Sequence, residues 1–476
     1  MCLLQLNDWP FRRFIVTTVS LLVSLDGLIL LDSLGLSVPI VRQLVAFVFL
    51  TFILGFIILR ILKIHNLGNI GSILFSVGLS LSFLMWMGFF INTLGKVLGL
   101  NNPISAISII ATLNISTLVL LYLSYVRDCN IQLDLENRNF RIFSPSFLFF
   151  VLLPFLAIFG TYLLNNYENN TLQLILLLII AVTPITVVLD LVSENYYPLA
   201  VLAISMALLY HTALISQYIW GADINYEYYF SSLVLKNSSW EPALPRNINA
   251  MLSVVILVPI YSIVTNLDIV KVLKIFYPFI YSLVPLGLYW IYREELGAKK
   301  AFLAVFFFMS YFHFYSCMPA LARQQIAELF LMLLIFTIMI GRKLLSRVNK
   351  SILLVIFSFS LVISHYGATY IFLLALVISV SVLVILNKIQ KRKIQKYLFN
   401  GENFSLVNWN FLSLFTTFAL AWYIYTSTST PYTAVIKIGD QILSSIGEFF
   451  SPEASQGMNI AMRELPFLQN IERWLH

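Results

Sequence analysis

The sequence contains very little charge. Only 11% of its 476 residues are Asp, Glu, Lys or Arg, whereas 60% are hydrophobic. A soluble domain carries about a quarter of its residues as charged side chains, because its surface faces water. The low charge therefore excludes a soluble globular protein, and the mean hydropathy of +0.89 agrees with this.

Several motifs of soluble enzymes are also missing. There is no Gly-rich phosphate-binding loop, no HExxH, no Ser-His-Asp pattern and no CxxC. The three cysteines, Cys2, Cys129 and Cys317, are too scattered to form a metal or redox motif. Nucleotide-driven chemistry thus has no support, and no hydrophilic domain is large enough for a soluble-type nucleotide-sugar enzyme.

What the chain has instead is a series of apolar runs, most of them long enough to cross a hydrocarbon core of about 30 Å as helices. They predict an all-α, polytopic transmembrane bundle with about 13 spans. The apolar runs lie near 14–35, 38–60, 70–93, 104–126, 145–164, 171–190, 198–216, 251–267, 272–292, 300–317, 325–341, 351–364, 367–387 and 408–427.

The basic residues predict the orientation of the bundle. The net charge of +7 does not indicate a nucleic-acid partner, because Lys and Arg gather in short loops between apolar runs. Arg12 and Arg13 place the N-terminus in the cytoplasm by the positive-inside rule. Counting spans forward then places the polar loop 217–248 on the extracytoplasmic side.

The run at 251–267 decides the topology of the second half. If it crosses the membrane, the basic segments 341–350 and 388–396 both lie outside. If it is juxtamembrane or re-entrant, both return to the cytoplasm. We favour the second interpretation, because two dense basic loops outweigh one apolar run of about 17 residues.

Three parts of the chain follow from this topology. Residues 1–197 would form N-terminal transmembrane helices, and residues 198–430 a transmembrane core with the outer loop 217–248. Residues 431–476 would be an extracytoplasmic tail. The predicted location is the cell membrane, with membrane lipids as partners.

The loop 217–248 contains an acid pair among tyrosines, in the stretch GADINYEYY (221–229). Asp223 and Glu227 are four residues apart, so a helix would place both carboxylates on one face. Such a carboxylate could take the proton of an attacking hydroxyl, or hold a divalent metal ion beside a phosphate, with Asp223 as ligand. The alternative is a solvated helix at the interface, with its tyrosines at headgroup depth.

A second polar group starts a later apolar helix, in the sequence RQQIAE (323–328). Arg323 could grip a phosphate oxygen, with Gln324 and Glu328 as further substrate-binding residues. Glu328 lies inside the helix and needs a partner, as does Asp26 in the middle of the first span. The alternative for Arg323 is a salt bridge that only fixes packing.

A third polar break, SHYG (364–367), separates two apolar runs. His365, together with Tyr366, could bind a phosphate or a metal ion, or transfer a proton. A lone histidine at a helix end is more often a satisfied structural group. His211 and His313 lie in apolar segments without matching spacing, and we interpret both as packing residues.

These residues resemble two known groups of membrane proteins. The acidic outer loop, the apolar segment after it and the later polar groups resemble GT-C-type integral-membrane glycosyltransferases, which use polyprenyl-phosphate-linked sugars. The stretches GADINYEYYFSSLV, LARQQIAELF and VISHYGATYIF also resemble an archaeal family of multi-spanning membrane proteins without an assigned activity, over roughly residues 217–375.

The GT-C resemblance implies that Asp223 or Glu227 acts as base or metal ligand, and that Arg323, Glu328 and His365 contact the lipid-linked donor. Two departures weaken it. The acidic loop follows the seventh apolar run rather than the first, and only a short segment follows the last run. Acceptor binding is therefore the least supported part.

The leading hypothesis is thus a cell-envelope glycosyltransferase that takes its sugar from a polyprenyl-phosphate donor on the extracytoplasmic side. Two alternatives remain open: a transporter or flippase of lipid-linked sugars, and a non-catalytic scaffold of the cell envelope.

Overall fold

The long apolar runs form long helices in the computed structural model, which describes residues 5–129, 144–339, 344–389 and 408–445. Within these ranges the regular structure is entirely helical. The all-α polytopic bundle predicted from the sequence is confirmed. The helices of the first half are α1 (Phe11–Ser33), α2 (Val41–Val48), α3 (Leu54–Ile61), α4 (Gly68–Val97), α5 (Ala106–Asp128), α6 (Pro145–Tyr167), α7 (Thr171–Val188), α8 (Tyr197–Ala213) and α9 (Ala222–Asn237).

The second half contains more short pieces. Its helices are α10 (Leu252–Val255), α11 (Leu257–Thr265), α12 (Ile269–Lys271), α13 (Tyr277–Tyr281), α14 (Leu283–Leu296), α15 (Ala298–Ser310), α16 (Ala322–Met339), α18 (Arg347–Ser364), α19 (Tyr366–Ile389), α21 (Trp409–Tyr425) and α22 (Thr430–Ser444). Three π-helical turns, η3 (Phe49–Ile53), η6 (Val272–Phe276) and η7 (His313–Cys317), and the 3₁₀ turns η2 (Leu6–Asp8), η4 (Glu194–Tyr196), η5 (Asn247–Ala250), η8 (Met318–Ala320) and η9 (Ser427–Ser429) complete them.

The described residues contain 11 helices long and apolar enough to cross a membrane, or up to 12 if the bent pair Ala298–Ser310 and His313–Ala320 is one span. This is fewer than the expected number of about 13. The apolar run expected near 408–427 forms α21, which has 17 residues and is not among these candidate spans.

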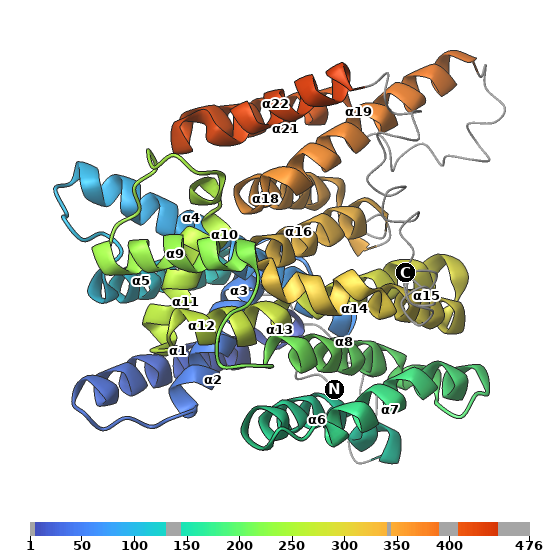
Figure 1. Ribbon diagram of the computed structural model, residues 1–476. Helices are drawn as coiled ribbons and strands as arrows, with labels where there is room; N and C mark the ends of the chain where they lie inside the picture. The colour runs from blue at the N-terminus through green and yellow to red at the C-terminus, as the bar shows by residue number, and fades with distance from the viewer. Residues whose placement is uncertain (1–4, 130–143, 340–343, 390–407, 446–476) are drawn as a thin grey trace.

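The segment between α9 and α12 does not reach across the bundle. The helices α10 and α11 form one apolar stretch, Leu252–Thr265, that is shorter than the spanning helices. It matches the juxtamembrane or re-entrant segment expected near 251–267. Both helices are buried, because α9 packs on one side of them and α2, α4 and α5 pack against α11 (Figure 1).

Hydrogen bonds show that this segment starts and ends at the same end of the bundle. Before it, Trp240 lies near the end of α4, where its backbone N–H donates to Asn92 Oδ1 at 2.8 Å. After it, Asn266 donates to Asp32 at the end of α1, at 2.8 Å. The chain from Trp240 to Asn266 therefore returns to the end from which it came. We call this the site end.

The other end of the bundle is held by charged side chains. Arg60, at the end of α3, donates to Asp128, the last residue of α5, at 2.7 Å. His65 lies between Asp128 and Asp8, with its Nε2 2.9 Å from Asp128 and its Nδ1 3.4 Å from Asp8. This opposite end also contains the start of α15, where Lys299 pairs with Asp190 at 2.6 Å.

Candidate functional site

The acid pair lies on α9, whose first residue follows a glycine. Gly221 has φ +114°, and a Cβ built there would lie 2.7 Å from the Cβ of Ala320. A side chain would therefore be strained by the backbone and would collide with η8. Glycine lets the start of α9 approach the segment that leads into α16.

Asp223 and Glu227 both contact Arg323, as the spacing of the acids on one helix face allows. Arg323 Nη2 donates to Asp223 Oδ2 at 2.7 Å, and its Nη1 donates to Glu227 Oε1 at 2.9 Å. The structure thus joins the first two polar groups identified in the sequence, which are 100 residues apart. We call these three residues the acid–arginine cluster.

Glu227 also caps α16. Its Oε2 accepts a hydrogen bond from the backbone N–H of Ala322 at 2.8 Å. Its Oε1 accepts one from the backbone N–H of Arg323 at 3.2 Å. A helix N-terminus has unpaired N–H groups and a partial positive charge, so it favours a carboxylate. Glu227 therefore fixes α16 to α9 in addition to pairing with the guanidinium.

Exposure separates the three members of the cluster. The side chain of Asp223 is 43% exposed, against 5% for Arg323 and none for Glu227. Burial raises the pKa of the Glu227 carboxyl above its ordinary value, and the charge of Arg323 and the two backbone N–H groups oppose this rise. Asp223 is thus the carboxylate of the cluster that a molecule in solvent can reach.

Gln324 and Glu328 form a second contact on α16. Gln324 donates to Glu328 Oε1 at 2.9 Å, and the hydroxyl of Tyr281 donates to Glu328 Oε2 at 2.8 Å. The partner that Glu328 needed is therefore present. Asp26 also has one, because Asn114 donates to both of its oxygens at 3.1 and 3.0 Å.

His365 lies near the cluster but has a structural contact of its own. Its Nδ1 accepts a hydrogen bond from the backbone N–H of Ala368 at 3.0 Å, so it caps the start of α19. Its ring stacks on Tyr366, with centroids 5.3 Å apart. Burial, followed by the charge of Arg323, lowers the pKa of His365 to about 3. At neutral pH the ring is therefore uncharged, and its Nδ1 is occupied by the bond to Ala368.

The turn around His365 depends on a glycine and on a serine that the sequence analysis did not single out. A Cβ on Gly367 would lie 2.9 Å from Cε1 of His365. Ser253 of α10 donates to the backbone carbonyl of Ser364 at 2.9 Å, and Tyr277 donates to the carbonyl of Ser253. A serine inside an otherwise apolar run was the only signal in the sequence for this connection.

The donor set at Asp223 fits a guanidinium better than a metal ion. Among the described residues, no three His, Cys, Asp or Glu side chains are grouped so that they could hold one. Asp223 and Glu227 already face Arg323, so a cation at Asp223 would meet the guanidinium.

Comparisons with known proteins indicate a membrane protein but do not indicate an activity. Residues 350–476 match the model of a family described as "Predicted membrane protein (DUF2206)". No curated protein and no solved structure matches the chain. The matched residues cover just over a quarter of the sequence and begin after the acid–arginine cluster. The chain is thus a multi-spanning membrane protein similar in its last part to that family.

Proposed function

We propose that this membrane protein transfers a sugar from a polyprenyl-phosphate donor to an acceptor hydroxyl, with Asp223 as the general base. The observation that carries the proposal is the division of exposure within the acid–arginine cluster. Arg323 and Glu227 are buried and hold each other in place, whereas Asp223 is half exposed at the edge. A carboxylate oriented by buried partners is a suitable proton acceptor.

In the proposed step, Asp223 is the group of the protein that takes the proton. Asp223 accepts the proton of the acceptor hydroxyl, and that oxygen forms a bond to the anomeric carbon of the sugar. The bond between the anomeric carbon and the phosphate oxygen breaks, and polyprenyl phosphate leaves with the electron pair. Arg323 Nη2 bonds to Asp223 Oδ2, so Oδ1 is the oxygen assigned to the proton.

The extracytoplasmic side of the cell membrane is part of this proposal. It is supported by the positive-inside pattern, which places Arg12 and Arg13 in the cytoplasm. The cluster lies at the site end, because α9 follows α8 there and Lys274 donates to the carbonyls of Ser216 and Tyr218 in the connecting loop. A lipid-linked donor would approach from the adjoining leaflet.

The test is Asp223→Asn in a host that lacks its own copy, with glycans and glycolipids profiled by mass spectrometry. We expect the product to fall by about 100-fold or more, because a general base contributes about 10² to 10⁴ in rate. Glu241→Gln is the matched control, since Glu241 is an exposed carboxylate at the same end, paired with Lys96 at 3.1 Å. An unchanged profile in Asp223→Asn would refute the proposal.

A second candidate, a flippase of lipid-linked sugars, is favoured by one observation. The pair α15 and η7–η8 is bent by 58°, and broken helices frame the substrate sites of many transporters. The two candidates differ in chemistry. A transferase forms product from donor and acceptor in detergent solution, without a membrane to cross, whereas a flippase forms none.

A further inference from the structure

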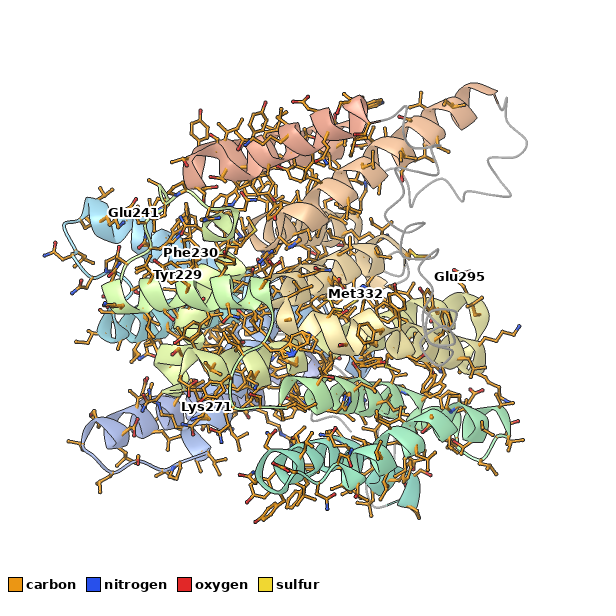
Figure 2. The ribbon with its side chains drawn as sticks, viewed as in Figure 1. Tyr229, Phe230, Glu241, Lys271, Glu295 and Met332 are labelled. Atoms are coloured by element: carbon orange, nitrogen blue, oxygen red, sulfur yellow. The ribbon has the colours of Figure 1, made fainter. Side chains whose placement is uncertain are left out.

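A pocket of about 520 Å³ lies against α9, on the face next to the one that holds Asp223 and Glu227. Tyr229 and Phe230 are labelled on this helix in Figure 2, and Glu241 lies in the loop that follows it. The pocket is lined by Asn225, Tyr226, Tyr229, Phe230, Leu233, Leu244, Pro245 and Arg246. It is therefore bounded by α9 on one side and by the loop after α9 on the other.

The pocket combines one positive charge with an apolar wall. The guanidinium of Arg246 lies 5.7 Å from the centre of the Tyr226 ring. Arg246 is exposed, and in the described part of the chain no carboxylate lies within ion-pair distance of it. Phe230, Leu233 and Leu244 supply the apolar wall. Such a pocket fits an anionic group joined to a hydrocarbon chain.

The contrast with Arg323 decides which arginine is available to a phosphate. Arg323 faces two carboxylates and is almost fully buried, so a phosphate there would have to displace Asp223. Arg246 can offer its planar donors without breaking an ion pair.

The loop that carries Arg246 is fixed by buried hydrogen bonds. Asn249, which is 1% exposed, donates to the carbonyls of Glu241 and Leu244 at 2.9 and 3.2 Å. The indole N–H of Trp240 donates to the side chain of Asn249 at 3.1 Å. These bonds shape the loop before any ligand arrives, so little ordering is needed on binding.

We propose that this pocket binds the phosphate of a membrane lipid, with Arg246 on the phosphate oxygens and the hydrocarbon chain along Leu233 and Leu244. The phosphate could belong to a polyprenyl phosphate or to a phospholipid. The inference deepens the proposed function, because a lipid-linked phosphate is the donor class named there. It places that phosphate at Arg246 rather than at Arg323.

The test measures binding to the purified full chain in a neutral detergent. The probes are citronellyl phosphate, dihexanoyl phosphatidic acid, inorganic phosphate and citronellol, and thermophoresis gives each dissociation constant. Arg246→Gln should weaken binding of the lipid phosphates about tenfold or more, as expected for a charge-assisted hydrogen bond. Arg246→Lys, which keeps the charge and loses the planar fork, should give an intermediate loss.

Lys236→Gln is the matched control, because it removes one exposed charge from the last turn of α9 outside the pocket. It should leave binding within twofold of the parent. Tighter binding of citronellyl phosphate than of phosphatidic acid would assign the donor's phosphate, and tighter binding of phosphatidic acid would assign a phospholipid. Equal losses in Arg246→Gln and Lys236→Gln, or citronellol binding as tightly as its phosphate, would overturn the inference.

The two proposals fail in different ways. Asp223→Asn should retain binding of citronellyl phosphate while transfer is lost. Transfer that survives in Asp223→Asn refutes the proposed function and leaves the Arg246 result standing. Binding that survives in Arg246→Gln refutes the pocket and leaves the role of Asp223 intact.

Discussion

The buried charges of the acid–arginine cluster each have a partner of opposite charge. Arg323 is buried between two carboxylates, and Glu227 is buried against a guanidinium and two backbone N–H groups. Low-polarity surroundings make such groups costly when they are unpaired. The members of the acid–arginine cluster should therefore differ in what their removal costs.

Replacing Glu227 by Ala should destabilise the protein strongly, because it leaves the charge of Arg323 buried beside two unpaired backbone N–H groups. Breaking a buried pair in this way costs about 3–5 kcal/mol. Asp223→Ala should cost about 1 kcal/mol or less, since its carboxylate is half exposed and screened by solvent. Thermal unfolding in detergent measures the stability of both variants. An equal loss of stability in Glu227→Ala and Asp223→Ala would contradict the different roles assigned to the two carboxylates.

His65, at the opposite end, should make stability depend on pH. Burial disfavours its charge, but hydrogen bonds and charges from Asp128 and Asp8 outweigh this and raise its pKa from 6.5 to about 9. A raised pKa stabilises the folded state below pH 6.5, and this stabilisation is lost as the pH rises through about 9. The loss should be about 3 kcal/mol.

Thermal unfolding of the parent and of His65→Gln between pH 6 and about 9.5 tests this linkage. The melting temperature of the parent should fall across that interval, and that of the variant should fall less. Parallel curves for the two proteins would show that His65 is not the group responsible.

At the scale of elements, the decisive piece is the short pair α10 and α11. Arg42 donates to the carbonyls of Ile263 and Val264 at 3.0 Å each, and Trp422 donates to the carbonyl of Ala250 at 3.0 Å. Both Arg42 and Trp422 lie at the site end of their helices. The start and the finish of the segment are thus tied to one end, so a segment with the length and apolarity of a weak span does not cross.

A labelling experiment tests this arrangement. In a background with Cys2, Cys129 and Cys317 replaced by Ala, we expect Lys236→Cys and Lys271→Cys to react with an impermeant maleimide from the same side of the membrane. Lys300→Cys should react only from the other side. These lysines are exposed, so access and not burial decides the result. Labelling of Lys236→Cys and Lys271→Cys from opposite sides would mean that α10 and α11 span.

At the scale of the whole molecule, the two ends of the bundle differ in chemistry. The opposite end is closed by the buried cluster of Arg60, Asp128 and His65, which ties α3 and α5 to the N-terminal segment. The site end has α9 packed over α10 and α11 (Figure 1). The side chains of Asp223 and Arg246 are accessible there. The end of α21 joins it, since Ser427 donates its N–H to the carbonyl of Pro242 at 2.7 Å.

The sequence by itself determined the class of the protein, because apolar runs of bilayer length and scarce charge admit few folds other than a helical membrane bundle. It also placed Asp223 and Glu227 on one face, since helix geometry sets that spacing. It predicted about 13 spans, and the described residues contain 11 candidate spans, or up to 12 with the bent pair.

Only the tertiary structure decided which groups meet. Asp26 and Glu328 each needed a partner, but Asn114 and Tyr281 lie far away in sequence and have no pattern that singles them out. Arg323 forms salt bridges with both acids, whereas His365 caps the start of α19. Long-range pairing depends on how helices pack, and helix packing follows the shape of the whole bundle rather than any local run of residues.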